Sequence, residues 1–439
     1  MLYRSTADPA HRATFREAVL RGTPPAPPGG GGGGLYVPVA PPSLPAGFAD
    51  GLAERPLAET ATALARLFIG ADEVSDDDLA AAVRHTLAFE IPLVAVEPGL
   101  SVLELFHGPT LAFKDVGARF LAAMLGLFNA GAERDLVVLV ATSGDTGGAV
   151  AAGLFGVPGV STVVLYPEGR VSALQEKQFA ALGGNVHALR VDGSFDDCQR
   201  LVKAMFDDAG LREQVALTSA NSISVARLVP QTFYYGALAT QALRQGLDRP
   251  AVVVPSGNVG NLTAGLLAKR AGLPLGRFVA ATNANDLLPD VLGGMPYTPR
   301  ASQPTLSTAM DVGDPSNLAR LLDLYGSPAA LAKYVDAVSV SDAETEAAMR
   351  RLDHEAGYVA DPHTAVGVAA WDRVRRPGES GVVLATAHPA KFPDEVRRVL
   401  GRVPDTPERL ARLAALPMLS ESLAPEPAAL RAWLVGTFG

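Results

Sequence analysis

The pattern of hydrophobic and polar positions changes near residue 100 of the chain. Beyond it, short apolar runs alternate with longer stretches in which apolar residues recur at helical spacing. The runs predict strands at 136–141, 161–166, 186–191, 251–254, 278–282 and 381–385. The stretches predict helices at 147–155, 174–182, 196–208, 230–245 and 262–271. Apolar strands that alternate with helices indicate open α/β units with mostly parallel sheets, covered on both faces.

The first 90 residues follow a different pattern. Helical spacing predicts helices at 13–20 and 79–89, and an apolar run predicts a short strand at 35–39. Between them lies the low-complexity tract TPPAPPGGGGGG at 23–34, which indicates an exposed loop with no required role.

The chain is therefore expected to have three parts. An N-terminal segment at 1–90 precedes an α/β region at 91–395, and a short helical tail follows at 396–439. A stretch rich in Ser and Asn near 218–224 places the seam between two α/β units at about 218–230.

Composition and charge restrict the classes of function. The content of 48% hydrophobic and 19% charged residues excludes a disordered chain. The formal net charge of −9 argues against broad binding to nucleic acid or to anionic membranes. The single cysteine, Cys198, excludes an intrachain disulfide framework and a cysteine-based zinc cluster. No apolar run reaches the roughly 18 residues that a membrane span needs, and the first 20 residues lack the apolar core of a signal peptide, so we expect a cytoplasmic protein.

One glycine-rich loop, PSGNVGN, follows the predicted strand at 251–254 and precedes a helix. Gly257 and Gly260 remove side chains where backbone N–H groups converge, and the helix N-terminus adds partial positive charge, so the loop suits a phosphate. The alternative is a glycine-rich turn that binds nothing. Neither GxxxxGK[ST] nor GxGxxG occurs in this loop, so a small phosphorylated cofactor is at least as plausible as a nucleotide.

A second loop, ATSGDTGGAV, follows the strand at 136–141. Its hydroxyls and backbone donors, from Ser143 to Gly147, suit a carboxylate ligand. Asp145 fits an anion site only if it bonds a hydroxyl or turns away. The alternative role of this loop is to cap the following helix.

Two single residues carry further candidate chemistry. Lys114 begins a helix whose face is apolar, and burial makes a lysine amine easier to deprotonate, which is what Schiff-base chemistry requires. The alternative is a solvated lysine paired with Asp115. Thr386 ends the strand at 381–385, where its hydroxyl can bond a heterocyclic nitrogen; the alternative is an ordinary turn threonine.

Together the motifs resemble the threonine synthase family of enzymes that depend on pyridoxal 5′-phosphate (PLP). The resemblance covers roughly residues 80–395, with a weaker N-terminal match in LYVP. It implies PLP fold type II, the tryptophan-synthase-β-like fold, as two open, mostly parallel α/β units with an N-terminal extension and a helical C-terminal tail. The motifs, in chain order, are HGPTLAFKDVGARF, ATSGDTGGAVA, LYPEGRVSALQEKQ, TSANSISVARL, PSGNVGNLTAGLLAKRAGLP, ATNAND and TAHPAKF.

The resemblance also implies roles for particular residues. Lys114 is similar to the lysine that forms the PLP aldimine, and Thr386 to the partner of the pyridine nitrogen. The phosphate cradle is implied to be Gly257, Asn258, Val259, Gly260 and Asn261. The substrate-binding residues implied are Thr110, Ser143, Gly144, Asp145, Thr146, Ser219, Asn221, Ser222 and Arg227. The form TSGDTG, with Asp145, is typical of the threonine synthase branch, whereas Val259 and Asn261 replace the Phe and Asp that are common there.

The activity implied is conversion of O-phospho-L-homoserine and water to L-threonine and phosphate, the last step of threonine biosynthesis. It requires γ-elimination and then addition of water at the β-carbon, with Lys114 as the implied catalytic residue and no metal. Two alternatives stay open: another PLP lyase of the same fold, such as a serine/threonine dehydratase, and a dinucleotide-dependent dehydrogenase. Monomer and homodimer also both stay open.

Overall fold

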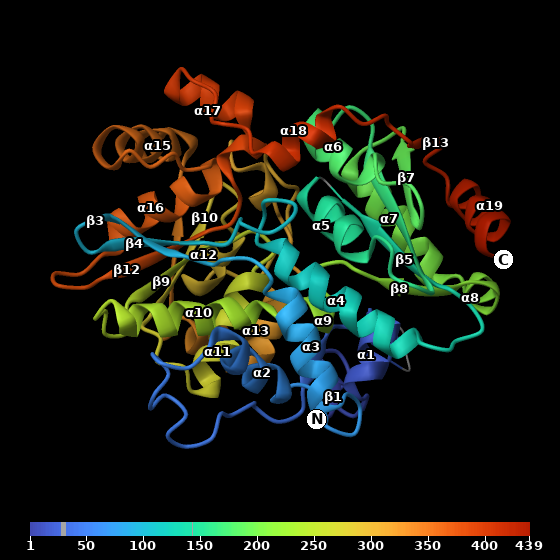
Figure 1. Ribbon diagram of the computed structural model, residues 1–439, viewed down its shortest axis with the longest axis horizontal. Helices are drawn as coiled ribbons and strands as arrows, with labels where there is room; N and C mark the ends of the chain where they lie inside the picture. The colour runs from blue at the N-terminus through green and yellow to red at the C-terminus, as the bar shows by residue number, and fades with distance from the viewer. Residues whose placement is uncertain (28–31, 143) are drawn as a thin grey trace.

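The computed structural model describes residues 1–27, 32–142 and 144–439. Two open sheets lie on opposite sides of the molecule, and helices fill the space between and around them (Figure 1). All pairs of neighbouring strands in these sheets are parallel except one. The predicted α/β fold of two mostly parallel units is confirmed.

The first sheet has the strand order β11-β10-β9-β12-β4-β3. Its strands β9, β10 and β12 are buried along their whole length, because helices cover both faces. The one antiparallel pair joins β3 to β4 at the edge of the sheet. In sequence order the strands are β3 (Leu93–Glu97), β4 (Leu100–Glu104), β9 (Ala251–Pro255), β10 (Phe278–Thr282), β11 (Val335–Ser339) and β12 (Gly381–Ala385).

The second sheet has the order β13-β7-β6-β5-β8 and is parallel throughout. Every residue of its two central strands is buried. Its strands are β5 (Leu136–Ala141), β6 (Val160–Pro167), β7 (Val186–Val191), β8 (Ala216–Ser219) and β13 (Glu421–Leu423).

The chain passes between the sheets more often than the sequence pattern indicated. It leaves the first sheet after β4 to build β5–β8 and returns at β9. The return lies between the end of β8 and the start of β9, and the seam at 218–230 stays a prediction; the outward passage after β4 was not predicted. The cause is that β3 is partly exposed at the sheet edge and β4, although buried, contains Ser101 and ends at Glu104, so neither strand forms an uninterrupted apolar run.

The helices that alternate with strands agree with the hydrophobic periodicity. Those predicted are α5 (Asp145–Leu154), α6 (Ala173–Ala180), α7 (Phe195–Asp207), α10 (Gln231–Arg244) and α11 (Gly260–Ala271). Several others were not predicted, mainly between β10 and β12. They are α8 (Ala209–Gln214), α9 (Val225–Leu228), α12 (Leu287–Leu292), α13 (Leu318–Tyr325), α14 (Pro328–Leu331), α15 (Asp342–Ala356) and α16 (Pro362–Val374), with the short 3₁₀ turns η1 (Thr308–Met310) and η2 (Pro389–Lys391).

The N-terminal segment forms a small layer against the helices. It comprises β1 (Tyr3–Ser5), α1 (Phe15–Arg21), β2 (Tyr36–Pro38), α2 (Leu57–Arg66) and α3 (Asp76–Thr86). The strands β1 and β2 pair antiparallel, and α2 packs on α10. Part of the Pro/Gly tract, residues 28–31, lies outside the described residues; at its described end the Gly33 carbonyl accepts a hydrogen bond from Ser5 Oγ.

The C-terminal tail runs across the top of the molecule from one sheet to the other (Figure 1). It holds α17 (Pro393–Leu400) against α15, α18 (Glu408–Ala414) against α6 and α19 (Pro427–Phe438) against α7. Helices were expected here, but the tail also adds β13, which pairs parallel with β7. Within the described residues, no helix combines the length and apolarity that a membrane crossing requires.

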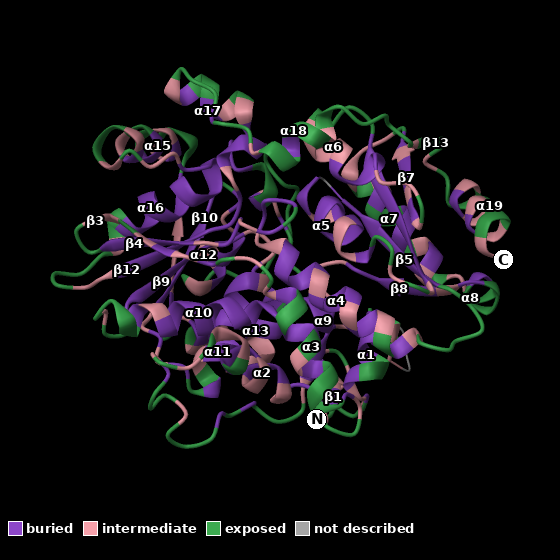
Figure 2. Ribbon diagram, in the orientation of Figure 1, coloured by how far each residue is buried: buried purple, intermediate pink, exposed green. Residues whose placement is uncertain are grey.

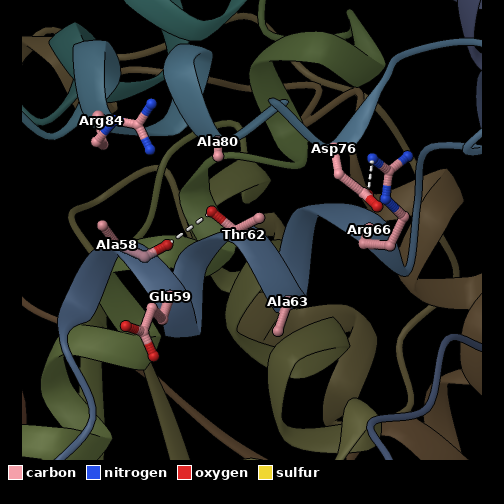
Figure 3. Close-up of a pocket in the computed structure, with 8 residues that line it drawn as sticks. All are labelled: Ala58, Glu59, Thr62, Ala63, Arg66, Asp76, Ala80 and Arg84. Carbon is pink, nitrogen blue, oxygen red and sulfur yellow. Dashed lines mark hydrogen bonds and ion pairs between the residues drawn. The ribbon is translucent and has the colours of Figure 1, made fainter. Parts of the chain in front are cut away.

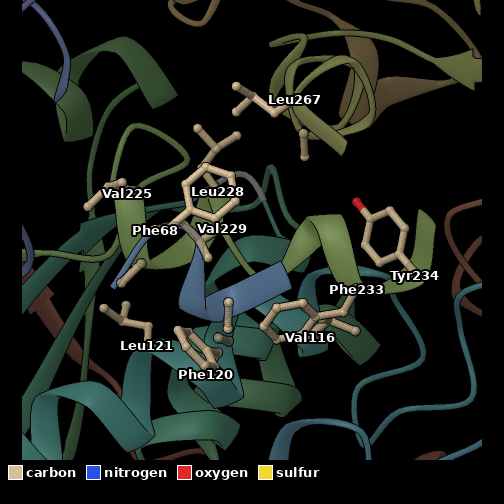
Figure 4. Close-up of a cluster of buried hydrophobic side chains, with 14 of the residues drawn as sticks. Phe68, Val116, Phe120, Leu121, Val225, Leu228, Val229, Phe233, Tyr234 and Leu267 are labelled. Atoms are coloured by element: carbon tan, nitrogen blue, oxygen red, sulfur yellow. The ribbon is translucent and has the colours of Figure 1, made fainter. Parts of the chain in front are cut away.

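The helix α4 (Lys114–Asn129) is anchored in the main core. Its Val116, Phe120 and Leu121 are buried in one cluster with Phe233 of α10 and Phe68 of the N-terminal segment (Figure 4). The sheets and the helices between them are largely buried, whereas α3, α17 and α19 expose much of their surface (Figure 2). This packing fixes the start of α4, where Lys114 stands.

Candidate active site

Lys114 is placed by a short backbone pairing just before α4. Ala112 and Ala387 form an antiparallel bridge, and the Phe113 N–H donates to the Thr386 carbonyl over 2.9 Å. The pairing therefore brings Lys114 and Thr386, which are far apart in sequence, to the same edge of the first sheet. Leu111 in this turn has a positive φ of 60°, a conformation that a non-glycine residue adopts at a cost of roughly 1–2 kcal/mol.

The amine of Lys114 lies in a largely buried, charged pocket. Its side chain is 16% exposed, and its Nζ is 3.8 Å from Asp145 Oδ2, which is too long for a hydrogen bond. Burial lowers the pKa of Lys114 to about 8, against the opposing attraction of Asp145. Asp115 is not its partner: that carboxylate accepts hydrogen bonds from the backbone and hydroxyl of Thr110. The lysine is thus able to exist as a neutral amine near neutral pH.

Asp145 is held by partners that the sequence argument did not identify. Its Oδ1 is 2.7 Å from Lys391 Nζ and also accepts from Gln175 Nε2 over 3.0 Å. Burial opposes its charge, but the two lysines outweigh burial, so the pKa of Asp145 lies well below its ordinary value. The carboxylate is therefore charged, and it faces two lysines rather than a hydroxyl.

The loop before α5 is shaped by Thr142. Its Oγ1 accepts hydrogen bonds from the N–H groups of Gly144 and Gly147, over 3.0 and 2.8 Å. Gly144 has a φ of 140°, which a residue with a side chain rarely adopts. Asp145 begins α5, and Thr146 beside it is partly exposed. Ser143, one of the predicted substrate-binding residues, lies outside the described residues.

The loop between β9 and α11 has the form of a phosphate cradle. Its left-handed residue is not a glycine but Val259, with a φ of 48°, which is strained for a β-branched side chain. Gly257 is required for close packing, since a Cβ there would lie 2.8 Å from Met310 Cα. Gly260 opens α11 beside the amide of Asn317, whose Nδ2 would be 3.3 Å from an added Cβ.

Buried donors without partners surround this loop. Among the described residues, Nδ2 of Asn261 and Nδ2 of Asn317 have no hydrogen-bond acceptor although both atoms are buried. Buried polar groups are normally satisfied, so such donors at a helix N-terminus indicate that an anion belongs there. The residues present therefore fit a phosphate group at the N-terminus of α11. Lys114, at the start of α4, offers an amine that can react with an aldehyde when it is neutral.

The segment 219–227 contacts the cradle loop. Asn258 Nδ2 donates to Ser222 Oγ over 2.5 Å, which ties this segment to the cradle loop. Arg227 is 4% exposed, donates to the Ala220 carbonyl over 2.7 Å, and has no carboxylate partner in the described part of the chain. Burial lowers the pKa of Arg227 to about 10. An unpaired, buried guanidinium is available to an anionic ligand.

The remaining predicted substrate residues form hydrogen bonds within the protein. Ser219 packs against Gly22 of the N-terminal segment and accepts from the Asn221 N–H over 3.3 Å. Asn221 accepts in turn from the Ser224 N–H. Thr110 uses its hydroxyl as a donor to Asp115, so toward a ligand the hydroxyl oxygen is left only as an acceptor.

Sequence reasoning missed three residues near the candidate site: Lys391, Asn317 and Arg320. Lys391 stands in the motif TAHPAKF, which was considered for Thr386 alone. Arg320 is buried and donates to the carbonyls of Tyr36 and Ile223 and to Asn317 Oδ1, so it joins the N-terminal strand to the segment 219–227. No local pattern signals Arg320, because the two carbonyls it binds, those of Tyr36 and Ile223, lie about 100 residues or more away in the chain.

A separate groove lies between α2 and α3, away from these residues (Figure 3). It has a volume of about 410 Å³ and is lined by small side chains such as Ala58 and Ala80. Arg66 and Asp76, which line the groove, form an ion pair with each other over 2.7 Å. It offers none of the donors described above and is not the candidate site.

Comparison with known proteins gives consistent matches. Three family models match the chain: "Pyridoxal-phosphate dependent enzyme" at residues 96–386, "Threonine synthase N terminus" at 2–87 and "Threonine synthase, C-terminal" at 364–433. A curated threonine synthase of Escherichia coli is 43% identical over 424 residues, which is 97% of each chain.

Solved structures agree over the full length. The crystal structure of the Escherichia coli threonine synthase has a TM-score of 0.91 at 42% identity and covers all of both chains. A PLP-bound threonine synthase from Brucella melitensis has a TM-score of 0.92 at 35% identity, covering 100% of this chain and 99% of that one.

Proposed function

Because the chain belongs to the threonine synthase family of PLP-dependent lyases, we propose that it converts O-phospho-L-homoserine and water into L-threonine and phosphate. In this reaction the C–O bond at the γ-carbon breaks and phosphate leaves with the electron pair. The β-carbon loses one proton and the γ-carbon gains one. Water then adds its hydroxyl at the β-carbon, and its other proton returns to the α-carbon, which had lost its own. The observation that carries the proposal is the buried Lys114, which stands between the Thr386 strand end and the Asp145 loop.

PLP, when bound, supplies an aldehyde for an amine and an electron-withdrawing ring that stabilises negative charge on the substrate carbon. Lys114 is the residue we assign to the aldehyde. The cradle residues Gly257, Asn258, Val259, Gly260 and Asn261 are assigned to the phosphate, since backbone N–H groups of α11 and the free amide of Asn261 suit it. Thr386 is assigned to the ring nitrogen. A hydroxyl there leaves the nitrogen less protonated than a carboxylate would, which favours elimination over transamination.

Lys114 is the proposed catalytic base and acid. With a pKa of about 8 it exchanges a proton readily near neutral pH, which suits removal of the α-proton and return of a proton later in the reaction. The pocket around it excludes most water, as its 16% exposed side chain indicates. Exclusion of water protects the reactive carbon until the addition step.

The substrate carries two anionic groups, and the site offers two regions with donors. We assign the α-carboxylate to the loop with Ser143, Gly144, Asp145 and Thr146, at the N-terminus of α5, where the helix dipole favours an anion. We assign the phosphate ester to Arg227, with Thr110, Ser219, Asn221 and Ser222 as further candidates. Arg227 is supported most directly, because its buried guanidinium lacks a carboxylate partner within the described residues.

The test is a product assay with the purified holoenzyme. O-Phospho-L-homoserine should yield threonine and inorganic phosphate in equal amounts, and Lys114→Ala should abolish both products and the visible absorbance band of the lysine-bound cofactor. Formation of 2-oxo acid and ammonia from serine or threonine, with none from phosphohomoserine, would instead establish the dehydratase alternative.

The chain acts on a small-molecule substrate. We further propose a cytoplasmic enzyme without nucleic-acid or membrane partners, supported by the net charge of −9 and the single buried Cys198. Its proposed parts are the N-terminal segment 1–90, the catalytic region 91–395 and the tail 396–439.

A further inference from the structure

Lys391 is a buried lysine beside the proposed catalytic lysine. Its side chain is only 1% exposed, and its Nζ contacts two acceptors: Asp145 Oδ1 over 2.7 Å and the Thr110 carbonyl over 2.9 Å. It ends the turn η2, five residues after Thr386. Lysines are almost never fully buried unless paired, so the site retains this charge at a cost in desolvation.

One carboxylate is divided between two lysines. Asp145 presents Oδ1 to Lys391 within hydrogen-bond distance, whereas its Oδ2 stays 3.8 Å from Lys114 Nζ. Gln175 Nε2 also donates to Oδ1 and fixes the orientation of the carboxylate from α6. The carboxylate is therefore held toward Lys391 and away from Lys114.

We propose that Lys391 is a positioning residue: it holds and neutralises the Asp145 carboxylate, so that Lys114 is free of a tight ion pair and reacts as a neutral amine with the PLP aldehyde. This inference rests on the proposed function of Lys114. Without Lys391, Lys114 becomes the nearest cation to a buried carboxylate, and a direct ion pair keeps its proton in place.

The other charges around Lys114 are consistent with this arrangement. Lys391, from η2, and Arg227, from α9, oppose its protonated form, and Asp145, from α5, favours it. Asp115, the adjacent carboxylate on α4, is turned to Thr110. Asp145 is thus the carboxylate nearest to Lys114, and Lys391 is its principal partner.

A merely structural role predicts something different. Lys391 also binds the Thr110 carbonyl, so in a structural role its removal would loosen the turn before Lys114 with no effect on the protonation of Lys114. The pH dependence of cofactor association distinguishes the two roles, because association of PLP with the apoenzyme requires a neutral Lys114 amine. Titration of PLP itself is the same for every variant.

The experiment measures the rate of PLP association with apoenzyme against pH, from the rise of the visible band. For Lys391→Met we expect the apparent pKa of association to rise from about 8 by about one unit or more, and for Asp145→Asn to fall by a similar amount. Lys391→Arg, which keeps the charge, should stay near the wild-type value. Lys269→Met removes a lysine bonded to a backbone carbonyl elsewhere and serves as the control.

The double variant Asp145→Asn/Lys391→Met keeps the test decisive even if Lys391→Met does not fold, since it leaves no unpaired charge. Because Lys391 acts through the Asp145 carboxylate, its removal in the Asp145→Asn background should change the apparent pKa much less than about one unit. A rise of a unit or more between Asp145→Asn and the double variant, or a Lys391→Met profile that superimposes on the wild type, overturns the inference. If the wild-type protein itself binds no PLP and forms no threonine, the proposed function fails instead.

Discussion

The tail helix α18 is expected to depend on one side chain for its position beside the active site. Leu410 is fully buried with Leu111 and Ala390, while nearly all other residues of α18 are exposed or partly exposed. A helix of seven residues is not stable by itself in water. We therefore predict that Leu410→Ala detaches α18 without unfolding the rest of the protein.

The magnitude follows from the burial of the side chain. Truncating leucine to alanine removes apolar groups worth about 2 kcal/mol of transfer free energy, and an unfilled cavity raises the cost to about 3 kcal/mol. The polar contacts of α18, such as Arg409 to the His107 carbonyl over 3.0 Å, are exposed and offset little of this. Since 1.4 kcal/mol is a factor of ten, the docking equilibrium should fall by about 30- to 150-fold.

Hydrogen exchange measures this directly. Amides of the peptide that covers α18 should lose protection by that factor in Leu410→Ala, while amides of the strands β5 and β6 keep theirs. The ratio kcat/KM should fall as well, because Leu111 and Ala390 flank the turns that carry Lys114 and Lys391.

The matched control is Leu416→Ala, a tail leucine that is 41% exposed and should behave as wild type. Unchanged exchange of α18 in Leu410→Ala would refute the argument. So would a uniform loss of protection over the whole chain, since that would mean the tail unfolds only together with both sheets.

Three further predictions concern buried polar groups. Replacing Arg320 with Met leaves two buried acceptors and one partly buried acceptor without a donor, so urea denaturation should show a loss of about 3 kcal/mol, against little change for the exposed Arg375→Met. Burial raises the pKa of Cys198 to about 12, so the thiol should not react with a disulfide reagent at pH 8 until the protein unfolds; reaction of the native protein would contradict its burial. In the apoprotein Lys114→Met should raise stability by up to about 3 kcal/mol at pH 7, because the folded pKa of about 8 lies below the ordinary 10.5 and protonated Lys114 is desolvated at a cost. As pH rises, Lys114 loses its proton in the folded state before it does so in the unfolded state. The stability gained by Lys114→Met should therefore shrink between pH 8 and 10.5 and vanish above pH 10.5. A gain that grows with pH would contradict the lowered pKa of Lys114.

The sequence determined the elements with strong local signals. The strands β5, β6, β7, β9, β10 and β12 are rich in apolar residues. The loops that follow β5, β9 and β12 carry sequence motifs that made them candidates for the site. Edge strands such as β3 and β13 are short and partly exposed, so they have no pattern distinct from a loop. Lys114, the loop with Gly257 and Gly260, and Thr386 were all candidates from their residues and from the resemblance those residues carry.

What only the tertiary structure decided is which charges meet. Asp145 was recognised as out of place in an anion site, but its partner Lys391 lies 246 positions along the chain and is brought to it by the pairing of the turns around Ala112 and Ala387. In the same way, Arg320 binds Tyr36 and Ile223 across three segments. Local sequence encodes periodicity and turn chemistry because these act over a few residues. The protonation state of a buried amine depends on charges within a few ångströms, which only the packed chain brings together.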